Sequence, residues 1–202
     1  IWIALLLVVI LGIFGSMAFS GKVFSVLSVF ISIIGVIFAL HILLLLLQYT
    51  IAAVLTKRNP FKLLATMMPA YFPALGTQSA AATIPVALEQ TLKNGVSEKI
   101  AGFVIPLCAT IHLSGSIMKI TACAMALMIL EGRPIDFTLF VGFIFMLGIA
   151  MVAAPGVPGG AIMAAVGILQ TMLGFNEEMI GLMIALYIAL DSFGTACNVA
   201  GD

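Results

Sequence analysis

The sequence predicts an all-α integral membrane protein, and three features carry that prediction. Hydrophobic residues make up 63% of the chain and charged residues only 8%, whereas soluble domains carry about 25% charged residues. Apolar stretches of about 20 residues, the length that crosses a bilayer as a helix, recur along the whole chain. Glycine and proline interrupt these stretches without the alternation of a β-barrel, so we expect broken transmembrane helices.

Composition also limits the function classes. The formal net charge is zero, and the sequence has no basic cluster with interleaved aromatic residues that could bind nucleic acid. Neither a nucleophile–base pair nor a metal-binding cluster is apparent, so we do not expect an enzyme. The cysteines Cys108, Cys123 and Cys197 lie in apolar runs and are interpreted as small packing residues, not as a disulfide framework.

The first part of the chain predicts two helices and then a hairpin. Residues 1–21 are expected to form one transmembrane helix, and 23–57 a long helix that tilts or projects into the cytoplasm. Residues 61–93 are too few for two full crossings, and prolines interrupt them. Their small, polar middle, GTQSAA, therefore predicts a re-entrant helical hairpin that turns at depth.

The remainder repeats this order. A helix over 98–131 is expected to break at TIHLSGS (110–116). Residues 137–174 predict a second re-entrant hairpin, which turns at AAPGVPGGA (153–161), and a last helix over 178–202 carries a polar motif. The chain should thus alternate hairpins with polar-bearing spans.

Charge indicates the orientation in the membrane. The loops beside the second hairpin carry mostly acidic residues, whereas basic residues flank the first: Lys57, Arg58, Lys62, Lys93 and Lys99. The positive-inside rule then places the base of the first hairpin in the cytoplasm and that of the second outside, in a multi-pass protein of the cell membrane. Hairpins that enter from opposite faces are typical of inverted repeats, whose tips meet at a binding site near the midplane.

A polar stripe marks the last helix. Asp191, Thr195, Asn198 and Asp202 follow i, i+4, i+7, i+11 spacing and so share one narrow face. Polar side chains can simply hold membrane helices together, but two carboxylates on one stripe favour a ligand or ion site. The carboxylate at the far end suits a hard cation that is also bound by carbonyl oxygens of broken backbone.

More polar side chains lie at the break in the preceding span: Thr110, His112, Ser114 and Ser116. His112 is either a satisfied core residue or a functional one that could exchange protons. Lys119, about one turn further on, is expected to pair with Asp191 or Asp202, or to anchor a ligand.

The two predicted tips are poor in functional side chains and rich in main-chain amides. Helix N-termini that start there would direct positive dipole ends at an anionic ligand group. Gly156, Gly159 and Gly160 would let the second tip move as a gate, unless GVPGG is a plain helix break.

These motifs resemble those of the dicarboxylate/amino acid:cation symporter family, which includes the glutamate transporters. GTQSAAATIP is similar to the family's serine-rich first tip, PGVPGGAIM to its second tip, and LDSFGTACNVAGD to its eighth-helix motif. The resemblance runs along the whole chain and corresponds to the C-terminal part of the family. Because the chain begins at Ile1 and stops inside a polar motif, we interpret it as a fragment without the N-terminal helices and the C-terminus.

The resemblance implies a homotrimeric, elevator-type symporter with a scaffold domain (1–21 here) and a mobile transport domain (22–202). It implies that Asp191 holds a substrate amino group, Asn198 the α-carboxylate, and that Thr195 contributes nearby. The substrate would also be cupped by main chain of both tips: Ser79, Ala80, Ala81, Gly156 and Val157. One sodium ion would be bound by Asp202 with carbonyl oxygens of three residues: Cys108, His112 and Asn198.

The sequence also departs from the family. Gly194 stands where glutamate and aspartate carriers have an eighth-helix arginine, and Gln78 replaces an arginine of the first tip. The family's NMDGT motif is HLSGS here (112–116), so one sodium-binding aspartate is missing. Lys119 has appeared on the same helix, facing the same region by analogy with the family.

We therefore expect a secondary active symporter that carries a neutral or cystine-like amino acid together with Na+ or H+. Lys119 has two candidate roles. It either occupies the lost sodium position, which would make transport less sodium-dependent or proton-coupled, or it replaces the missing arginine and binds an acidic amino acid or dicarboxylate. An ion channel is a further class, disfavoured because paired tips would occlude the site.

Overall fold

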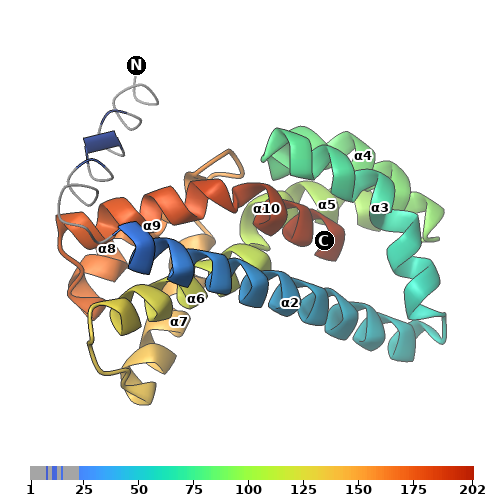
Figure 1. The fold of residues 1–202 in the computed structure, drawn as a ribbon. Helices are drawn as coiled ribbons and strands as arrows, with labels where there is room; N and C mark the ends of the chain where they lie inside the picture. Colours follow the sequence, from blue (N-terminus) through green and yellow to red (C-terminus); the bar gives the residue numbers. More distant parts are fainter. Residues whose placement is uncertain (1–7, 9–10, 13–14, 16–22) are drawn as a thin grey trace.

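The computed structural model describes residues 8, 11–12, 15 and 23–202. All regular secondary structure in this part of the chain is helical (Figure 1), which confirms the predicted all-α fold class. The predicted scaffold helix over 1–21 lies outside the described residues, apart from four single positions.

The helices follow the predicted order with small shifts of their ends. The long helix is α2 (Val23–Thr56), the first hairpin is α3 (Pro60–Thr77) with α4 (Ala80–Lys93), and the broken span is α5 (Glu98–Ile111) with α6 (Ser114–Leu130). The second hairpin is α7 (Phe137–Met151) with α8 (Gly160–Leu173), followed by α9 (Glu177–Ala189) and α10 (Asp191–Gly201). Figure 1 shows the two hairpins at opposite ends of the molecule, with α2 and the α9–α10 pair running between them.

Local capping explains where the first hairpin begins and turns. Asn59 precedes α3, and its side chain accepts hydrogen bonds from the main-chain N–H groups of Phe61 and Lys62. Helix α3 ends at Gln78 in the left-handed conformation (φ 54°), and the Ser79 hydroxyl then caps α4 by accepting from Ala82 N at 3.2 Å. The turn therefore falls inside the predicted GTQSAA segment.

The second hairpin is less regular at its turn. Asp136 caps α7 through Thr138 N and Leu139 N, at 2.7 and 3.1 Å. Between α7 and α8 the chain leaves the helical conformation over 152–159, the segment that contains PGVPGG. This segment forms the second tip.

One predicted helix is divided. The sequence predicts a single helix over 178–202, but α9 and α10 meet at Leu190 with a bend of 60°. No proline or glycine lies at residues 188–191, so the local sequence gives no cause for the bend. The physical reason is tertiary, because the Asp191 carboxylate at the start of α10 is held by groups from α6 and the second tip.

Helix length and composition fit a membrane. Two stretches of the described chain, Ile31–Thr56 and Glu98–Leu130, are long and apolar enough to cross a bilayer, and the bent pair α9–α10 makes a third if it is counted as one span. The larger apolar core joins α6, α7, α8 and α9. A smaller, alanine-rich cluster joins α3, α4, α5 and α10, where small side chains let the helices approach closely.

Candidate functional site

The tips of the two hairpins meet, as the inverted-repeat pattern predicts. The Ser79 hydroxyl donates to the Gly156 carbonyl oxygen at 2.9 Å, and Ala81 N approaches the same oxygen at 3.3 Å. A Cβ atom on Gly156 would lie 2.5 Å from the carbonyl oxygen of Ala109 on α5. Only glycine therefore allows the second tip to pack this closely against the broken span.

A small cavity of about 10 Å³ lies beneath the tips. Its wall includes six of the residues predicted from the sequence: Ala80, Gly156, Val157, Asp191, Thr195 and Asn198. Ser79 and Ala81 adjoin it at the contact between the tips. Helices α6 and α9 contribute Ser116 and Tyr187 to the wall, and neither residue was predicted from the sequence to bind a ligand.

Lys119 lies behind this wall and pairs with Asp191. Its Nζ is 3.0 Å from Asp191 Oδ1, 3.5 Å from the Tyr187 carbonyl oxygen and 3.4 Å from the centroid of the Tyr187 ring. The lysine is 0% exposed and Asp191 is 3% exposed. The other carboxylate oxygen, Oδ2, accepts a hydrogen bond from Gly159 N at 2.8 Å. Asp191 therefore joins the buried lysine to the second tip.

Gly194 provides the space that the lysine occupies. A Cβ atom at this position would lie 2.9 Å from Lys119 Nζ and 3.2 Å from its Cε. The missing side chain at 194 and the lysine at 119 are thus two parts of one arrangement, because a larger residue on α10 would displace the ammonium group.

Replacing Gly194 with alanine is expected to destabilise the protein by about 1–3 kcal/mol, since the new methyl group pushes Lys119 away from Asp191. Gly167→Ala is the matched control, because Gly167 lies in α8 with nothing within 4 Å of its Cβ position. Alanine there should instead stabilise by up to about 1 kcal/mol. Thermal unfolding of both variants in detergent measures the difference, and equal shifts would contradict the steric argument.

Asn198 fastens α10 to the start of α6. Its Oδ1 accepts from Gly115 N at 2.8 Å and from Ser116 N at 3.3 Å, and its Nδ2 donates to Ser116 Oγ at 3.0 Å. The residue before α6, Leu113, has no side chain that can cap the helix. The asparagine therefore satisfies helix N-terminal amides from another helix.

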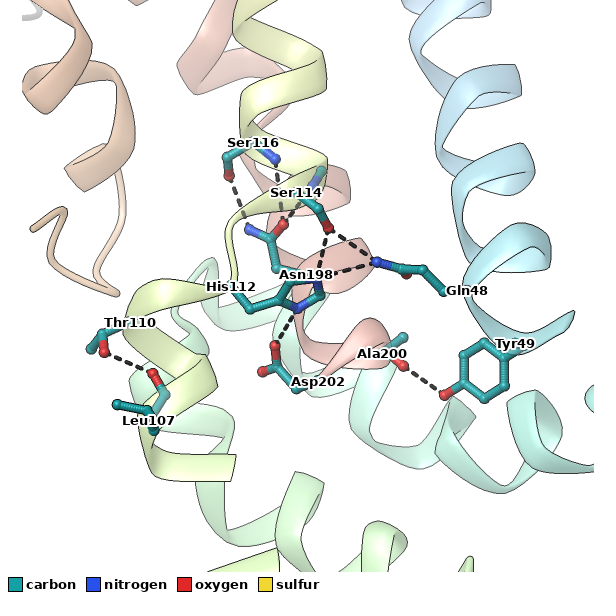
Figure 2. Close-up of polar contacts among 11 residues, drawn as sticks. Gln48, Tyr49, Leu107, Thr110, His112, Ser114, Ser116, Asn198, Ala200 and Asp202 are labelled. Atoms are coloured by element: carbon teal, nitrogen blue, oxygen red, sulfur yellow. Dashed lines mark hydrogen bonds and ion pairs between the residues drawn. The ribbon is translucent and has the colours of Figure 1, made fainter. Parts of the chain in front are cut away.

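Two of the predicted sodium ligands, His112 and Asp202, lie together at the other end of α10, where Figure 2 shows His112 between Asp202 and a group of polar side chains. His112 Nδ1 lies 2.8 Å from Asp202 Oδ1, and its Nε2 lies 3.0 Å from Ser114 Oγ and 3.2 Å from Gln48 Nε2. A carboxylate only accepts hydrogen bonds, so Nδ1 carries a hydrogen toward Asp202. The Asp202 side chain is 1% exposed.

From the sequence, this region is predicted to bind a cation through the Asp202 carboxylate and main-chain carbonyl oxygens, and the contact of the His112 imidazole with Asp202 was not predicted. Two of those carbonyls already accept bonds along their helices: Cys108 O from His112 N at 2.9 Å, and Asn198 O from Asp202 N at 3.0 Å. Each carbonyl oxygen keeps a second lone pair. The carboxylate and carbonyls are the oxygen types that a hard cation takes.

Helix α2 contributes contacts that the sequence analysis did not foresee. His41 Nε2 lies 3.1 Å from the Gly115 carbonyl oxygen, and the Tyr49 hydroxyl donates to the Ala200 carbonyl oxygen at 2.6 Å. His41 and Gln48 are seven residues apart on a mostly apolar helix and so face the same way. This spacing is the sequence feature from which the contacts of His41 and Gln48 with the site could have been predicted.

Comparisons with known proteins identify a family. The family model described as the sodium:dicarboxylate symporter family matches residues 1–202. The chain is 33% identical over 152 residues to excitatory amino acid transporter 2 of Homo sapiens, a match that covers 74% of this chain and 26% of that protein. It is 29% identical over 148 residues to neutral amino acid transporter B(0) of Mus musculus, which covers 73% of this chain and 27% of that protein.

The chain thus spans about a quarter of the length of these curated relatives. The family model nevertheless covers every residue from 1 to 202. The chain belongs to the sodium:dicarboxylate symporter family.

Proposed function

We propose that this chain forms the substrate-handling part of a secondary active symporter for a small amino acid or dicarboxylate, coupled to a cation. The observation that carries the proposal is the contact of Ser79 with Gly156 directly above the cavity that Asp191 and Asn198 line. Tips that close over a binding site allow a substrate to be enclosed before it is released. A channel would need a continuous path at this point, which the joined tips block.

Charge in the site favours a neutral or cystine-like amino acid. Lys119 and Asp191 compensate each other within the described site, so a substrate with no net charge leaves the balance unchanged. Asp191 retains acceptor capacity for a substrate amino group, because a carboxylate has about four lone-pair positions and two are in use. Asn198 lines the cavity as the proposed residue for the α-carboxylate, and Thr195 lines it nearby.

The alternative substrate is an acidic amino acid or a dicarboxylate. It requires Lys119 to leave Asp191 and take over the role of the missing arginine. The relatives named above are called excitatory and neutral amino acid transporters, so their names leave both substrate classes open.

The cotransported cation is proposed to be Na+, with H+ as the alternative. Asp202 and the carbonyl oxygens of Cys108, His112 and Asn198 would bind Na+ at the end of α10. The His112 imidazole beside Asp202 is the feature that supports the proton alternative.

The moving unit is proposed to be residues 22–202, and 1–21 the scaffold, within a homotrimer of elevator type in the cell membrane. Hydrogen bonds from α2 to α6 and α10 support this boundary, because His41, Gln48 and Tyr49 tie α2 to the site. The base of the α3–α4 hairpin is expected on the cytoplasmic side.

Uptake into proteoliposomes tests the proposal. The radiolabelled substrates are neutral amino acids, cystine, glutamate and succinate. We expect one of these classes to accumulate inside above its outside concentration, driven by a Na+ or an H+ gradient. The Na+ gradient, the H+ gradient and the membrane potential are each varied separately. Asp202→Asn should reduce gradient-driven substrate accumulation at least about tenfold. This corresponds to a loss of about 1.4 kcal/mol in the coupling free energy between cation and substrate. Equilibration without accumulation would indicate a channel, and consumption of substrate an enzyme.

A further inference from the structure

The Lys119 ammonium group is surrounded entirely by protein. Its neighbours are a carboxylate oxygen of Asp191, the main-chain carbonyl oxygen of Tyr187 and the face of the Tyr187 ring. The side chain is 0% exposed, and Asp191 and Tyr187 stand between it and the cavity beneath the tips. A substrate in that cavity meets Asp191, and it reaches Lys119 only if this shell opens.

The bend at Leu190 makes this shell attractive for a cation. Tyr187 is in the last turn of α9, where carbonyl oxygens carry the partial negative charge of a helix C-terminus. Asp191 is the first residue of α10, where a carboxylate is favoured by the positive end of the helix. The 60° bend brings both helix ends to one place. A carboxylate and a carbonyl oxygen are ligands that hard cations use in proteins.

We propose that the Lys119 ammonium is a built-in cation, which fills the position beside Asp191 that a free monovalent cation would otherwise occupy. Asp191 then remains charged during transport without carrying a Na+ of its own. The inference rests on the proposed symport function and refines it, because it predicts that no Na+ binds beside Asp191 during transport. The alternative role, a substrate anchor, needs a lysine in the cavity wall, and Lys119 lies behind that wall.

The proposal has a direct consequence for Lys119→Met. The variant keeps most of the side-chain volume but leaves Asp191 buried and uncompensated, an arrangement that proteins avoid. The vacated position retains the Asp191 and Tyr187 oxygens, so added Na+ should bind there and restore stability. A ligand that binds only the folded state raises the melting temperature as its concentration rises.

The test compares melting temperatures of the full-length protein in detergent at pH 8, in NaCl or choline chloride at equal ionic strength. Between 1 and 100 mM Na+, the melting temperature of K119M should rise by about 3–6 °C more than that of the wild type, for a dissociation constant of about 10 mM. Any Na+ response of the Asp202 region is present in both proteins and cancels in this difference.

Two further variants keep the test decisive. K93M is the matched control, because Lys93 also pairs with an acid, Glu89 at 2.7 Å, but with both side chains more than half exposed. It should respond to Na+ like the wild type. The double variant K119M/D191N removes both charges, should fold, and should lose the extra Na+ response.

Three results would overturn the proposal. One is an equal Na+ response in K119M and wild type, and another is an extra response that persists in K119M/D191N. The third is a K119M protein whose stability depends on pH and not on Na+, since Asp191 would then be compensated by a proton. Melting needs no substrate, so these results remain decisive if uptake fails, and uptake of an amino acid remains informative if the Lys119 proposal fails.

Discussion

Replacing Asp191 with asparagine is expected to lower the free energy of unfolding by about 3–5 kcal/mol and to abolish uptake. The substitution removes the only charge partner that the described structure gives Lys119, whose ammonium would stay buried without compensation. It also weakens the acceptor for Gly159 N, which holds the second tip. Chemical unfolding in detergent and proteoliposome uptake measure the two effects, and Na+ should rescue neither, in contrast to its effect on K119M.

Asp136→Asn provides the control for this prediction. Asp136 is also an acid at the start of a helix, but it is exposed and bonds only to main-chain N–H groups of α7. Asparagine is about as good a helix cap as aspartate. The free energy of unfolding of this variant should therefore fall by less than about 0.5 kcal/mol, and its uptake should be normal. A similar loss in both variants would show that burial of the Lys119 pair does not matter.

The second large effect is expected for Asn198→Ala. The change leaves the buried N–H groups of Gly115 and Ser116 without their acceptor, at a cost of about 1–3 kcal/mol for each buried group. We expect the free energy of unfolding to fall by about 2–4 kcal/mol in total. Uptake should fall at least about tenfold, because α10 no longer holds the start of α6 in place.

The comparison for this variant is Asn176→Ala. Asn176 caps α9 through Met179 N at 2.9 Å, but it is exposed and lies in a loop away from the cavity. Asn176→Ala should lower the free energy of unfolding by only about 1 kcal/mol and leave uptake unchanged. If N198A and N176A are equally mild, Asn198 does not hold the broken span.

The hairpins and the break could be predicted because their signals are local. Asn59, Ser79 and Asp136 cap helices within three residues of themselves, and the first hairpin was predicted within a residue of its observed ends. The break at His112–Leu113 likewise falls inside the TIHLSGS segment. These elements depend on residues that are neighbours in the sequence.

The bend at Leu190 and the imidazole contact depend on residues far apart in the sequence. Asp191 is 72 positions from Lys119, and Asp202 is 90 positions from His112. The stripe of α10 named both acids as candidates, and the choice between Asp191 and Asp202 as the partner of Lys119 needed the fold. Gly194 drew attention as a missing arginine, but only the structure shows that the lysine occupies its space.

The size of the cavity has a consequence for binding kinetics. A space of about 10 Å³ holds one water molecule at most, so no amino acid can enter while Ser79 and Gly156 are in contact. Binding must then follow a spontaneous opening of the tips, and the measured dissociation constant is the intrinsic one divided by the fraction of molecules that are open. A looser contact between the tips would therefore raise the open fraction and speed association, even though it removes an interaction.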